Sequence, residues 1–230
     1  LGLGEPIPIS AANMLNFGDL LDEIVNAFPK EQYEEEEDVI KIAVIGKPNV
    51  GKSSLINELV GENRVIVSPI AGTTRDSIDT PFEKDGDRYM LIDTAGIRRK
   101  SKVTEDIERY SVIRAVAAIE RSDVALLMID AAEGITEQDK KIAGVAHEAG
   151  KGIIVVVNKW DLIAKETNTM RDFKRKIEAE FPFMTYAPSV FISVKDHQRI
   201  DNVINMAKYV AETRAMRVPT GQLNALLQDA

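Results

Sequence analysis

A chain of 230 residues is long enough for one sizeable α/β domain with about 50 residues to spare. Hydrophobic residues make up 44% of the chain and no apolar run approaches the ~20 residues of a membrane span, so we expect no membrane insertion. The absence of cysteine excludes disulfides and thiolate metal sites, and the net charge of −8 disfavours nucleic-acid binding through bulk electrostatics.

The first 38 residues differ in pattern from the rest of the chain. They lack the basic start and apolar core of a secretory signal, which predicts a cytoplasmic protein, and they begin without methionine, which is typical of a fragment. Residues 1–30 combine a short predicted strand with a predicted helix at 16–28, as at the end of a domain. Residues 31–38, "EQYEEEED", are acidic and carry no apolar stripe, so we expect a linker there.

From Val39 onward, buried-type strands alternate with amphipathic helices. We expect strands at 39–46, 82–93, 123–130, 152–161 and 188–193, and helices at 52–61, 108–122, 136–150, 169–181 and 199–214. Asp85-Gly86 divides the second strand segment into a hairpin, Gly61 ends the first helix, and Thr136 caps the third. This alternation predicts a three-layer α/β fold, with a doubly wound, mainly parallel sheet and one antiparallel hairpin. Such sheets bind ligands at the carboxyl ends of their strands.

The stretch "GKPNVGKS" matches the phosphate-loop pattern G-x-x-x-x-G-K-[ST] and lies between a predicted strand and a predicted helix. Its glycines allow backbone N–H groups to surround phosphates at the positive end of the helix. Lys52 can reach the β- and γ-phosphates, and the Ser53 hydroxyl can ligate Mg²⁺. The predicted phosphate-binding residues are Gly46, Lys47, Pro48, Asn49, Val50, Gly51, Lys52 and Ser53.

The stretch "NKWD", which ends a later strand, favours guanine over adenine as the base. An Asp161 carboxylate can accept hydrogen bonds from N1–H and the 2-amino group of guanine, which adenine lacks. Asn158 can contact the O6/N7 edge and tie the loop down, while the stem of Lys159 can lie over the base plane. This order of motifs disfavours an ATPase or a nucleoside kinase. The predicted base-binding residues are Asn158, Lys159, Trp160 and Asp161, with Ser193, Val194 and Lys195 after the last strand.

The stretch "DTAG" follows the hairpin and predicts a loop that handles magnesium and the γ-phosphate. Asp93 can hold Mg²⁺ through a water, and the Gly96 N–H can contact the γ-phosphate. Thr94, Ala95 and Ile97 belong to the same predicted nucleotide loop. Upstream, "AGTTRD" offers a threonine to complete the Mg²⁺ shell when GTP is bound, and we favour Thr74 over Thr73.

The ordered set GKPNVGKS, AGTTRD, DTAG, NKWD and a terminal S-x-K loop resembles the translation-factor-related GTPases. Within them, "RVIVSPIAGTTRDSIDT", "DTAGIRRKSKV" and "ERYSVIRAVAAIERSDV" make residues 39–213 similar to the second G domain of the EngA/Der family of bacterial tandem GTPases. The resemblance implies a Ras-like G domain of the P-loop NTPase class that hydrolyses GTP with Mg²⁺. The base loop departs from the family, because it reads S-V-K where S-A-K or S-A-L is commoner, but the Val194 N–H that would contact guanine O6 survives this change.

The resemblance also implies a biological role and an origin for the two ends. Residues 1–30 look like the close of a preceding G domain, 31–38 like a linker, and 214–230 like a linker and the start of a KH-like domain. The implied role is that of a switch in late assembly of the large ribosomal subunit, with the subunit or its ribosomal RNA as partner. The alternative is a nucleotide-gated binding module whose hydrolysis needs the ribosome or the missing domains.

Ile97 stands where many GTPases carry a glutamine that orients the attacking water. Three replacements are open: a neighbouring polar side chain, a residue of a partner, or a monovalent cation. Asn49 offers an oxygen for K⁺ beside the β–γ bridge, as in cation-dependent members of the group, or it is a turn residue that bonds its own backbone. Arg75 and the basic run "RRKSK" at 98–102 are either solvated or in contact with phosphate, RNA or a neighbouring domain. The catalytic candidates are Asn49, Lys52, Thr74 and Gly96.

Overall fold

The structure is a computed structural model, and it describes residues 8–10, 20, 39–62, 79–94 and 107–216. The chain divides into two units, residues 1–37 and residues 38–230, and the sheet and its helices belong to the second. Within the described ranges, no helix is both long and apolar enough to cross a membrane.

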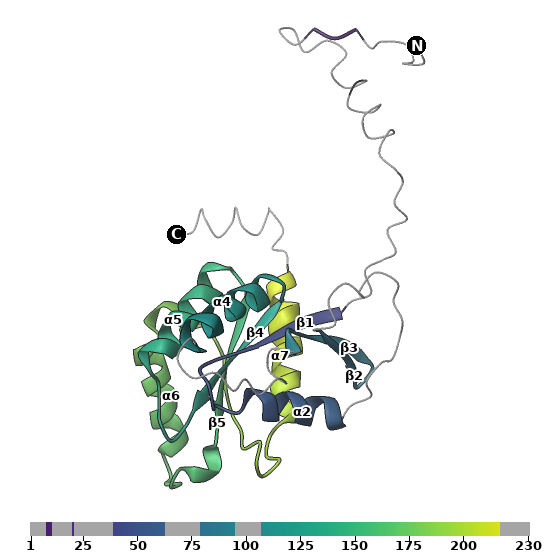
Figure 1. The fold of residues 1–230 in the computed structure, drawn as a ribbon. Coiled ribbons are helices and arrows are strands. Elements are labelled where there is room, and N and C mark those ends of the chain that lie inside the picture. The colour runs from purple at the N-terminus through teal and green to yellow at the C-terminus, as the bar shows by residue number, and fades with distance from the viewer. Residues whose placement is uncertain (1–7, 11–19, 21–38, 63–78, 95–106, 217–230) are drawn as a thin grey trace, which may run out of the picture. The chain divides into compact units, whose positions relative to one another are not determined.

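In the described part of the chain, six strands form one sheet in the order β2-β3-β1-β4-β5-β6 (Figure 1). All neighbouring pairs are parallel except β2 and β3, which form an antiparallel hairpin at one edge. This confirms the predicted α/β sheet with a single antiparallel hairpin. The strands are β1 (Val39–Ile45), β2 (Thr80–Lys84), β3 (Asp87–Ile92), β4 (Val124–Asp130), β5 (Gly152–Asn158) and β6 (Ser189–Phe191).

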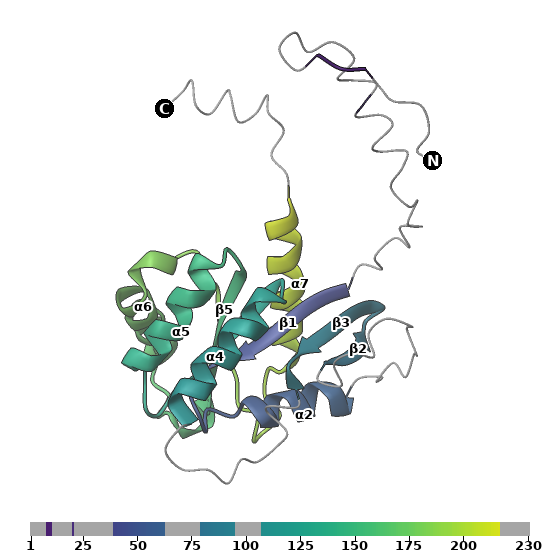
Figure 2. The same cartoon turned by 45° about the horizontal axis from the view of Figure 1, so that its top comes forward.

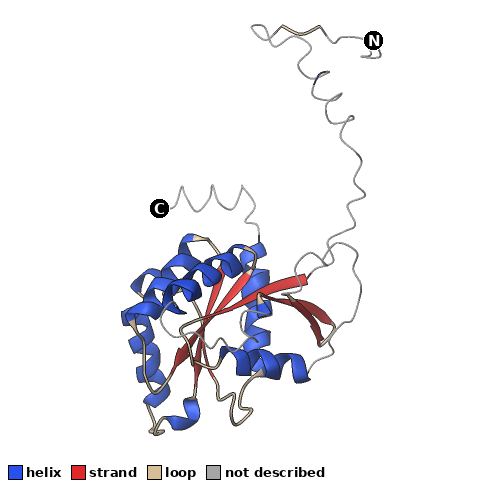
Figure 3. Cartoon of the chain, in the orientation of Figure 1, coloured by secondary structure: helices blue, strands red, loops and turns tan. Residues whose placement is uncertain are grey.

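Helices cover both faces of the sheet, which gives the three layers (Figures 2 and 3). The α-helices are α2 (Lys52–Glu62), α4 (Ile107–Glu120), α5 (Glu137–Glu148), α6 (Thr169–Glu180) and α7 (Asp201–Ala215), and the short 3-10 helices are η1 (Trp160–Leu162) and η2 (Pro182–Met184). Apolar residues of α2 and α7 pack in one core cluster, whereas those of α4, α5 and α6 pack in the other. Alternate residues of each central strand enter opposite clusters, as Leu126 and Leu127 of β4 do, because successive side chains of a strand point to opposite faces.

Local sequence signals account for several turns and caps. Asp85 and Gly86 both have positive φ, 54° and 86°, as a two-residue hairpin of this type requires. Thr136 caps α5 in a capping box with Asp139, as its sequence position predicts. The prediction that Gly61 ends the first helix is wrong, because α2 continues to Glu62. Gly61 has no left-handed φ, which a terminating glycine needs.

The sheet topology brings the predicted nucleotide motifs to one edge. The parallel strands β1, β3, β4, β5 and β6 all end at the same side of the sheet. The loops that follow these strands begin at residues 46, 93, 131, 159 and 192. Four of the five carry a motif from the sequence, and the loop after β4 is the one that the motifs did not include. This edge is therefore the candidate site.

Candidate functional site

The phosphate loop depends on two glycines at positions where no other residue fits. Gly46 has φ of 139° and Gly51 has φ of 101°, both in the region that L side chains rarely adopt. A Cβ on Gly46 would lie 2.6 Å from the carbonyl oxygen of Met128, and a Cβ on Gly51 would overlap the side-chain amide of Asn158. The loop therefore runs close against β4 and against the end of β5, which leaves room only for backbone.

Lys52 begins α2 and returns its ammonium group over the loop. The Nζ atom donates hydrogen bonds to the carbonyl oxygens of Gly46 at 2.8 Å and Lys47 at 2.6 Å. Burial lowers the pKa of Lys52 from 10.5 to about 8, and the negative charge of Asp139 opposes this shift. Phosphate oxygens beside the ammonium would stabilise its charged form, so an anionic ligand is the chemical complement of this group.

The remaining loop residues divide into anchors and exposed positions. Val50 is fully buried in the core, and the Lys47 ammonium pairs with the carboxylate of Glu133 in the loop after β4. Pro48, Asn49 and Ser53 are exposed. Asn49 has a positive φ of 63°, which a short amide side chain tolerates better than most. Asn49 and Ser53, which both carry side-chain oxygens, thus lie at exposed positions of the loop and at the start of α2.

Asn158 joins the phosphate loop, β5 and the base loop through one buried side chain. It is 3% exposed, and its Nδ2 donates to the Val50 carbonyl at 2.8 Å. Its Oδ1 accepts the backbone N–H of Val194 at 3.1 Å. Three segments that are far apart in sequence are therefore linked by two hydrogen bonds.

This network changes the expectation for Val194. The sequence assigned its backbone N–H to guanine O6, but in the structure this N–H donates to Asn158. Guanine O6 could therefore accept the Val194 N–H only by sharing it with the Asn158 amide oxygen or by replacing that oxygen as the acceptor. Val194 itself is buried, and the neighbouring Lys195 is exposed.

Asp161 and Ser193 lie together at the ends of β5 and β6. The Ser193 hydroxyl donates to Asp161 Oδ1 at 2.7 Å, and it also accepts the N–H of Asp196 at 3.2 Å. This hydroxyl holds the carboxylate in one orientation, and each carboxylate oxygen retains a lone pair for a further donor. The geometry brings together two residues that the sequence placed in separate motifs.

Trp160 supports the base loop from the core side. Its side chain is 4% exposed and packs edge-on against the rings of Phe173 and Phe191, with centroid distances of 5.5 and 4.6 Å. The sequence grouped Trp160 with the nucleotide-binding residues because it lies within "NKWD". Its buried indole anchors η1 beneath the loop, and the backbone N–H of Trp160 donates to the carbonyl of Ile192 at 3.1 Å.

The loop after β3 is described only as far as Thr94. Asp93 has a positive φ of 56°, and its N–H donates to the carboxylate of Asp79 at 2.9 Å. Thr94 shares a hydrogen bond of 2.8 Å with the hydroxyl of Thr80, which ties this loop to the β2 edge. The predicted residues Thr73, Thr74, Arg75, Ala95, Gly96, Ile97 and 98–102 lie outside the described residues.

Sequence reasoning missed the residues of the loop after β4. Asp130 ends β4, is 3% exposed, and pairs with the ammonium of Lys159. Glu133, three residues later, pairs with Lys47. A lone aspartate at a strand end carries no motif, so the only available signal was its position at the carboxyl edge of the sheet. This loop contacts both the phosphate loop and the base loop.

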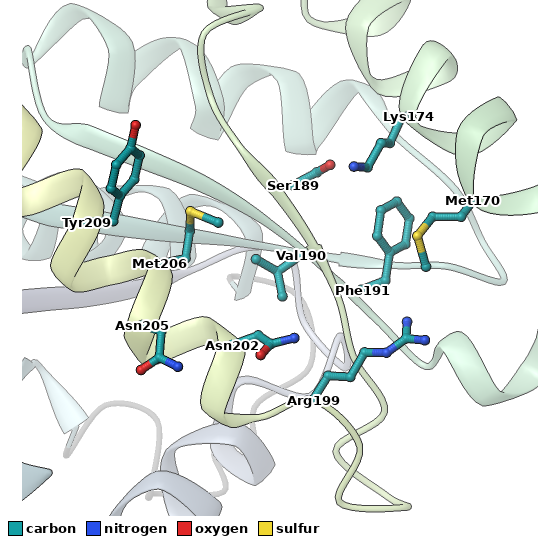
Figure 4. Close-up of a pocket in the computed structure, with 10 residues that line it drawn as sticks. All are labelled: Met170, Lys174, Ser189, Val190, Phe191, Arg199, Asn202, Asn205, Met206 and Tyr209. Carbon is teal, nitrogen blue, oxygen red and sulfur yellow. The ribbon is translucent and has the colours of Figure 1, made fainter. Parts of the chain in front are cut away.

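The cavity shown in Figure 4 lies elsewhere. It has a volume of about 500 Å³ and is lined by residues of α6, β6, α7 and the loop before α7, among them Phe191, Arg199 and Tyr209. None of its lining residues belongs to the phosphate loop or the predicted base loops. We therefore place the candidate site at the linked loops, where the chemistry converges, and not in this cavity.

Residues 41–159, just over half of the chain, match the family described as 50S ribosome-binding GTPase. The chain belongs to this family. GTPase Der of Alkaliphilus oremlandii is 59% identical over 231 residues, which cover 100% of this chain and 52% of that protein. The resemblance to EngA/Der is thereby confirmed, and the chain spans about half the length of the curated relatives it matches.

Solved structures support the same fold. Era of Aquifex aeolicus, in a crystal structure bound to GDP.AlF4-, is 34% identical with a TM-score of 0.56 over 74% of this chain and 56% of that chain. A structure of Era in complex with MgGDPNP and a segment of 16S ribosomal RNA has the same identity, TM-score and coverage. The Ras-like arrangement that the sequence predicted is confirmed by these likenesses.

Proposed function

We propose that this chain is a guanine-nucleotide switch that binds GTP and hydrolyses it to GDP and phosphate. One observation carries the proposal: the buried amide of Asn158 bonds both Val50 of the phosphate loop and Val194 of the base loop. A site built this way couples recognition of the base to the position of the phosphates. Membership of a GTPase family and the likeness to GTPase Der support the same activity.

The base would be read by the carboxylate of Asp161. Guanine presents two neighbouring donors, N1–H and the 2-amino group, and an ionised carboxylate accepts both. The Ser193 hydroxyl already orients this carboxylate. Adenine presents an acceptor at N1, which would face the carboxylate without a hydrogen bond and at an electrostatic cost. The proposed preference is therefore for guanine.

The phosphates would lie against the loop between β1 and α2. Its backbone N–H groups and the Lys52 ammonium supply the positive charge that an anionic ligand needs. The donor set for Mg²⁺ fits by chemistry, since the hydroxyl of Ser53 and the carboxylate of Asp93 offer the oxygen ligands that this ion prefers. Mg²⁺ held there would neutralise charge on the β- and γ-phosphates. Thr74 is proposed as a further ligand in the GTP state.

Hydrolysis in this chain is proposed to use K⁺ in place of a water-orienting glutamine. Ile97 has no polar atom, whereas Asn49 is exposed in the phosphate loop with its φ at 63°. That position would let its amide oxygen ligate a monovalent cation beside the β–γ bridge, where added positive charge stabilises the transition state. The backbone N–H of Gly96 is proposed to contact the γ-phosphate.

The proposed biological role is in assembly of the large ribosomal subunit. The family description and the Der relatives support it, and an Era structure includes ribosomal RNA. The chain spans about half of those relatives, so we propose that ribosome contact also involves a preceding G domain and a KH-like domain. A cytoplasmic location stays a prediction from the sequence.

Single-turnover hydrolysis of GTP by the isolated chain tests the proposed activity. Wild type and Asn49→Ala are compared in K⁺ and in Na⁺ at equal ionic strength, with Mg²⁺ present. We expect hydrolysis that K⁺ accelerates at least tenfold in wild type and not in Asn49→Ala, since one electrostatic contact to the transition state contributes on that scale. Equal rates in Na⁺ and K⁺, or full K⁺ activation in the variant, would contradict the cation proposal. Tight GTP binding without hydrolysis would favour the nucleotide-gated binding module.

A further inference from the structure

The carboxylate of Asp130 accepts hydrogen bonds from three donors, two in its own turn and one in the proposed base loop. Its Oδ1 accepts the backbone N–H of Ala132 at 2.9 Å and that of Glu133 at 3.4 Å, which closes the turn after β4. Its Oδ2 pairs with the ammonium of Lys159. One oxygen therefore shapes the turn, and the other holds a lysine that belongs to the proposed base site.

Burial strengthens the pairing between Asp130 and Lys159. The Asp130 side chain is 5% exposed, and the Lys159 side chain is 34% exposed. Burial alone would raise the pKa of Asp130, but the hydrogen bonds from Lys159, Ala132 and Glu133 hold this pKa below its ordinary value. The carboxylate is thus ionised at neutral pH in a setting that water screens poorly.

The backbone brings the two residues together at the ends of adjacent strands. Asp130 lies opposite Asn158 in the register of β4 and β5, and Lys159 is the next residue along. Lys159 has φ of 61°, a left-handed conformation that is uncommon for a lysine. In this conformation its side chain returns toward the end of β4, where the charge of Asp130 fixes its far end.

We infer that Asp130 is a positioning residue of the guanine site, which holds the Lys159 ammonium so that the lysine stem lies ready along the face of the base. This inference rests on the proposed guanine-nucleotide binding. A free lysine loses side-chain entropy when a ligand orders it. A lysine that is already fixed before binding avoids this loss, so the nucleotide binds more tightly.

A second ion pair of the same loop provides a comparison. Glu133 pairs with Lys47, but its side chain is 61% exposed, so solvent screens the pair. Substitution of Glu133 removes a carboxylate from the same turn without touching Lys159. It therefore tests whether nucleotide affinity depends on any negative charge in this loop or only on the buried charge of Asp130.

A double-mutant cycle on the affinity for a fluorescent GDP analogue tests the inference. The proteins are wild type, Asp130→Asn, Lys159→Ala and the double variant, with Glu133→Gln as the matched control. Asparagine at 130 keeps an oxygen for the two turn N–H groups and loses the charge that holds Lys159. We expect Asp130→Asn to weaken GDP binding about tenfold in the presence of Lys159 and less than twofold when Lys159 is alanine. Glu133→Gln is expected to change affinity less than twofold.

The outcomes separate the inference from the proposed function. A weakening by Asp130→Asn that is equal in both Lys159 backgrounds would show that Asp130 acts only through the turn, and it would overturn the inference. Unchanged affinity in Asp130→Asn would overturn it as well. Failure of wild type to bind the GDP analogue would remove the proposed function itself. Since the base is common to both nucleotides, a non-hydrolysable GTP analogue should lose affinity by the same factor as GDP, and a loss confined to one nucleotide contradicts a base-site role.

Discussion

Truncation of Asn158 to alanine is the perturbation for which the structure predicts the largest effect on stability within the site. The change removes the donor to the Val50 carbonyl at 2.8 Å and the acceptor of the Val194 N–H at 3.1 Å. Both backbone groups are buried with the amide, which is 3% exposed, so solvent does not replace the lost bonds. A buried polar group that loses its partner costs ~1–3 kcal/mol.

Two such groups give an expected loss of about 2–6 kcal/mol in the free energy of unfolding. For a domain of this size each kcal/mol lowers Tm by ~2–4 °C, so the variant should melt about 4–24 °C below wild type. Urea and thermal unfolding of the nucleotide-free protein measure both quantities. GDP affinity should fall by at least about 100-fold, because the amide aligns the two loops that would contact the ligand.

Asn205→Ala is the matched control, since Asn205 is an exposed asparagine on α7. The same chemical change there should alter the free energy of unfolding by less than ~0.5 kcal/mol. If Asn158→Ala loses under about 1 kcal/mol, like the control, the amide does not link the loops and the reasoning fails.

Three further changes follow from the same geometry. Gly51→Ala should lower the free energy of unfolding by about 1–3 kcal/mol in urea denaturation, because φ of 101° is strained for alanine and its Cβ would overlap the Asn158 amide. A loss below ~0.5 kcal/mol would contradict that close approach. Lys52→Met should stabilise the nucleotide-free protein by about 1 kcal/mol, since burial lowers the pKa of Lys52 to about 8. The same change should weaken GDP binding at least about 100-fold in a titration. A less stable variant would show that the buried charge carries no net cost. Tyr89 is 2% exposed, and its pKa is raised to about 12, chiefly by burial. The protonated phenol therefore contributes stability below pH 10 that is lost as the pH rises toward 12. Tyr89→Phe should reduce this alkaline loss by about 1–2 kcal/mol, as measured by urea denaturation between pH 10 and 12. An identical alkaline loss in the variant would exclude Tyr89 as its source.

Elements with a complete local signal could be predicted from the sequence. The hairpin at Asp85-Gly86 needs two positive φ values, which these residue types tolerate, and Thr136 lies three residues before a carboxylate that completes its cap. Strand and helix alternation predicted the sheet, because each pattern depends on neighbouring residues alone. The topology then placed the motifs at one edge without further information.

Features that depend on contacts between distant residues could not be predicted in this way. The pairing of Asp130 with Lys159 spans 29 residues, and an aspartate at a strand end has the same local appearance whether or not a lysine meets it. The burial of Trp160 depends on Phe173 and Phe191, which reach it only in the folded sheet. The hydrogen bond from the Val194 N–H to the Asn158 amide has no sequence signature, because it joins residues 36 positions apart.

Asp161→Asn tests whether the linked loops recognise guanine, because this change should exchange the base preference of the site. Affinities for GTP and xanthosine triphosphate are measured for wild type and the variant in Mg²⁺. An asparagine amide can donate to the 2-oxo group of xanthine but cannot accept both guanine donors, so we predict that wild type prefers GTP and that the variant prefers xanthosine triphosphate. If Asp161→Asn keeps wild-type affinity for GTP and gains none for xanthosine triphosphate, Asp161 does not recognise guanine.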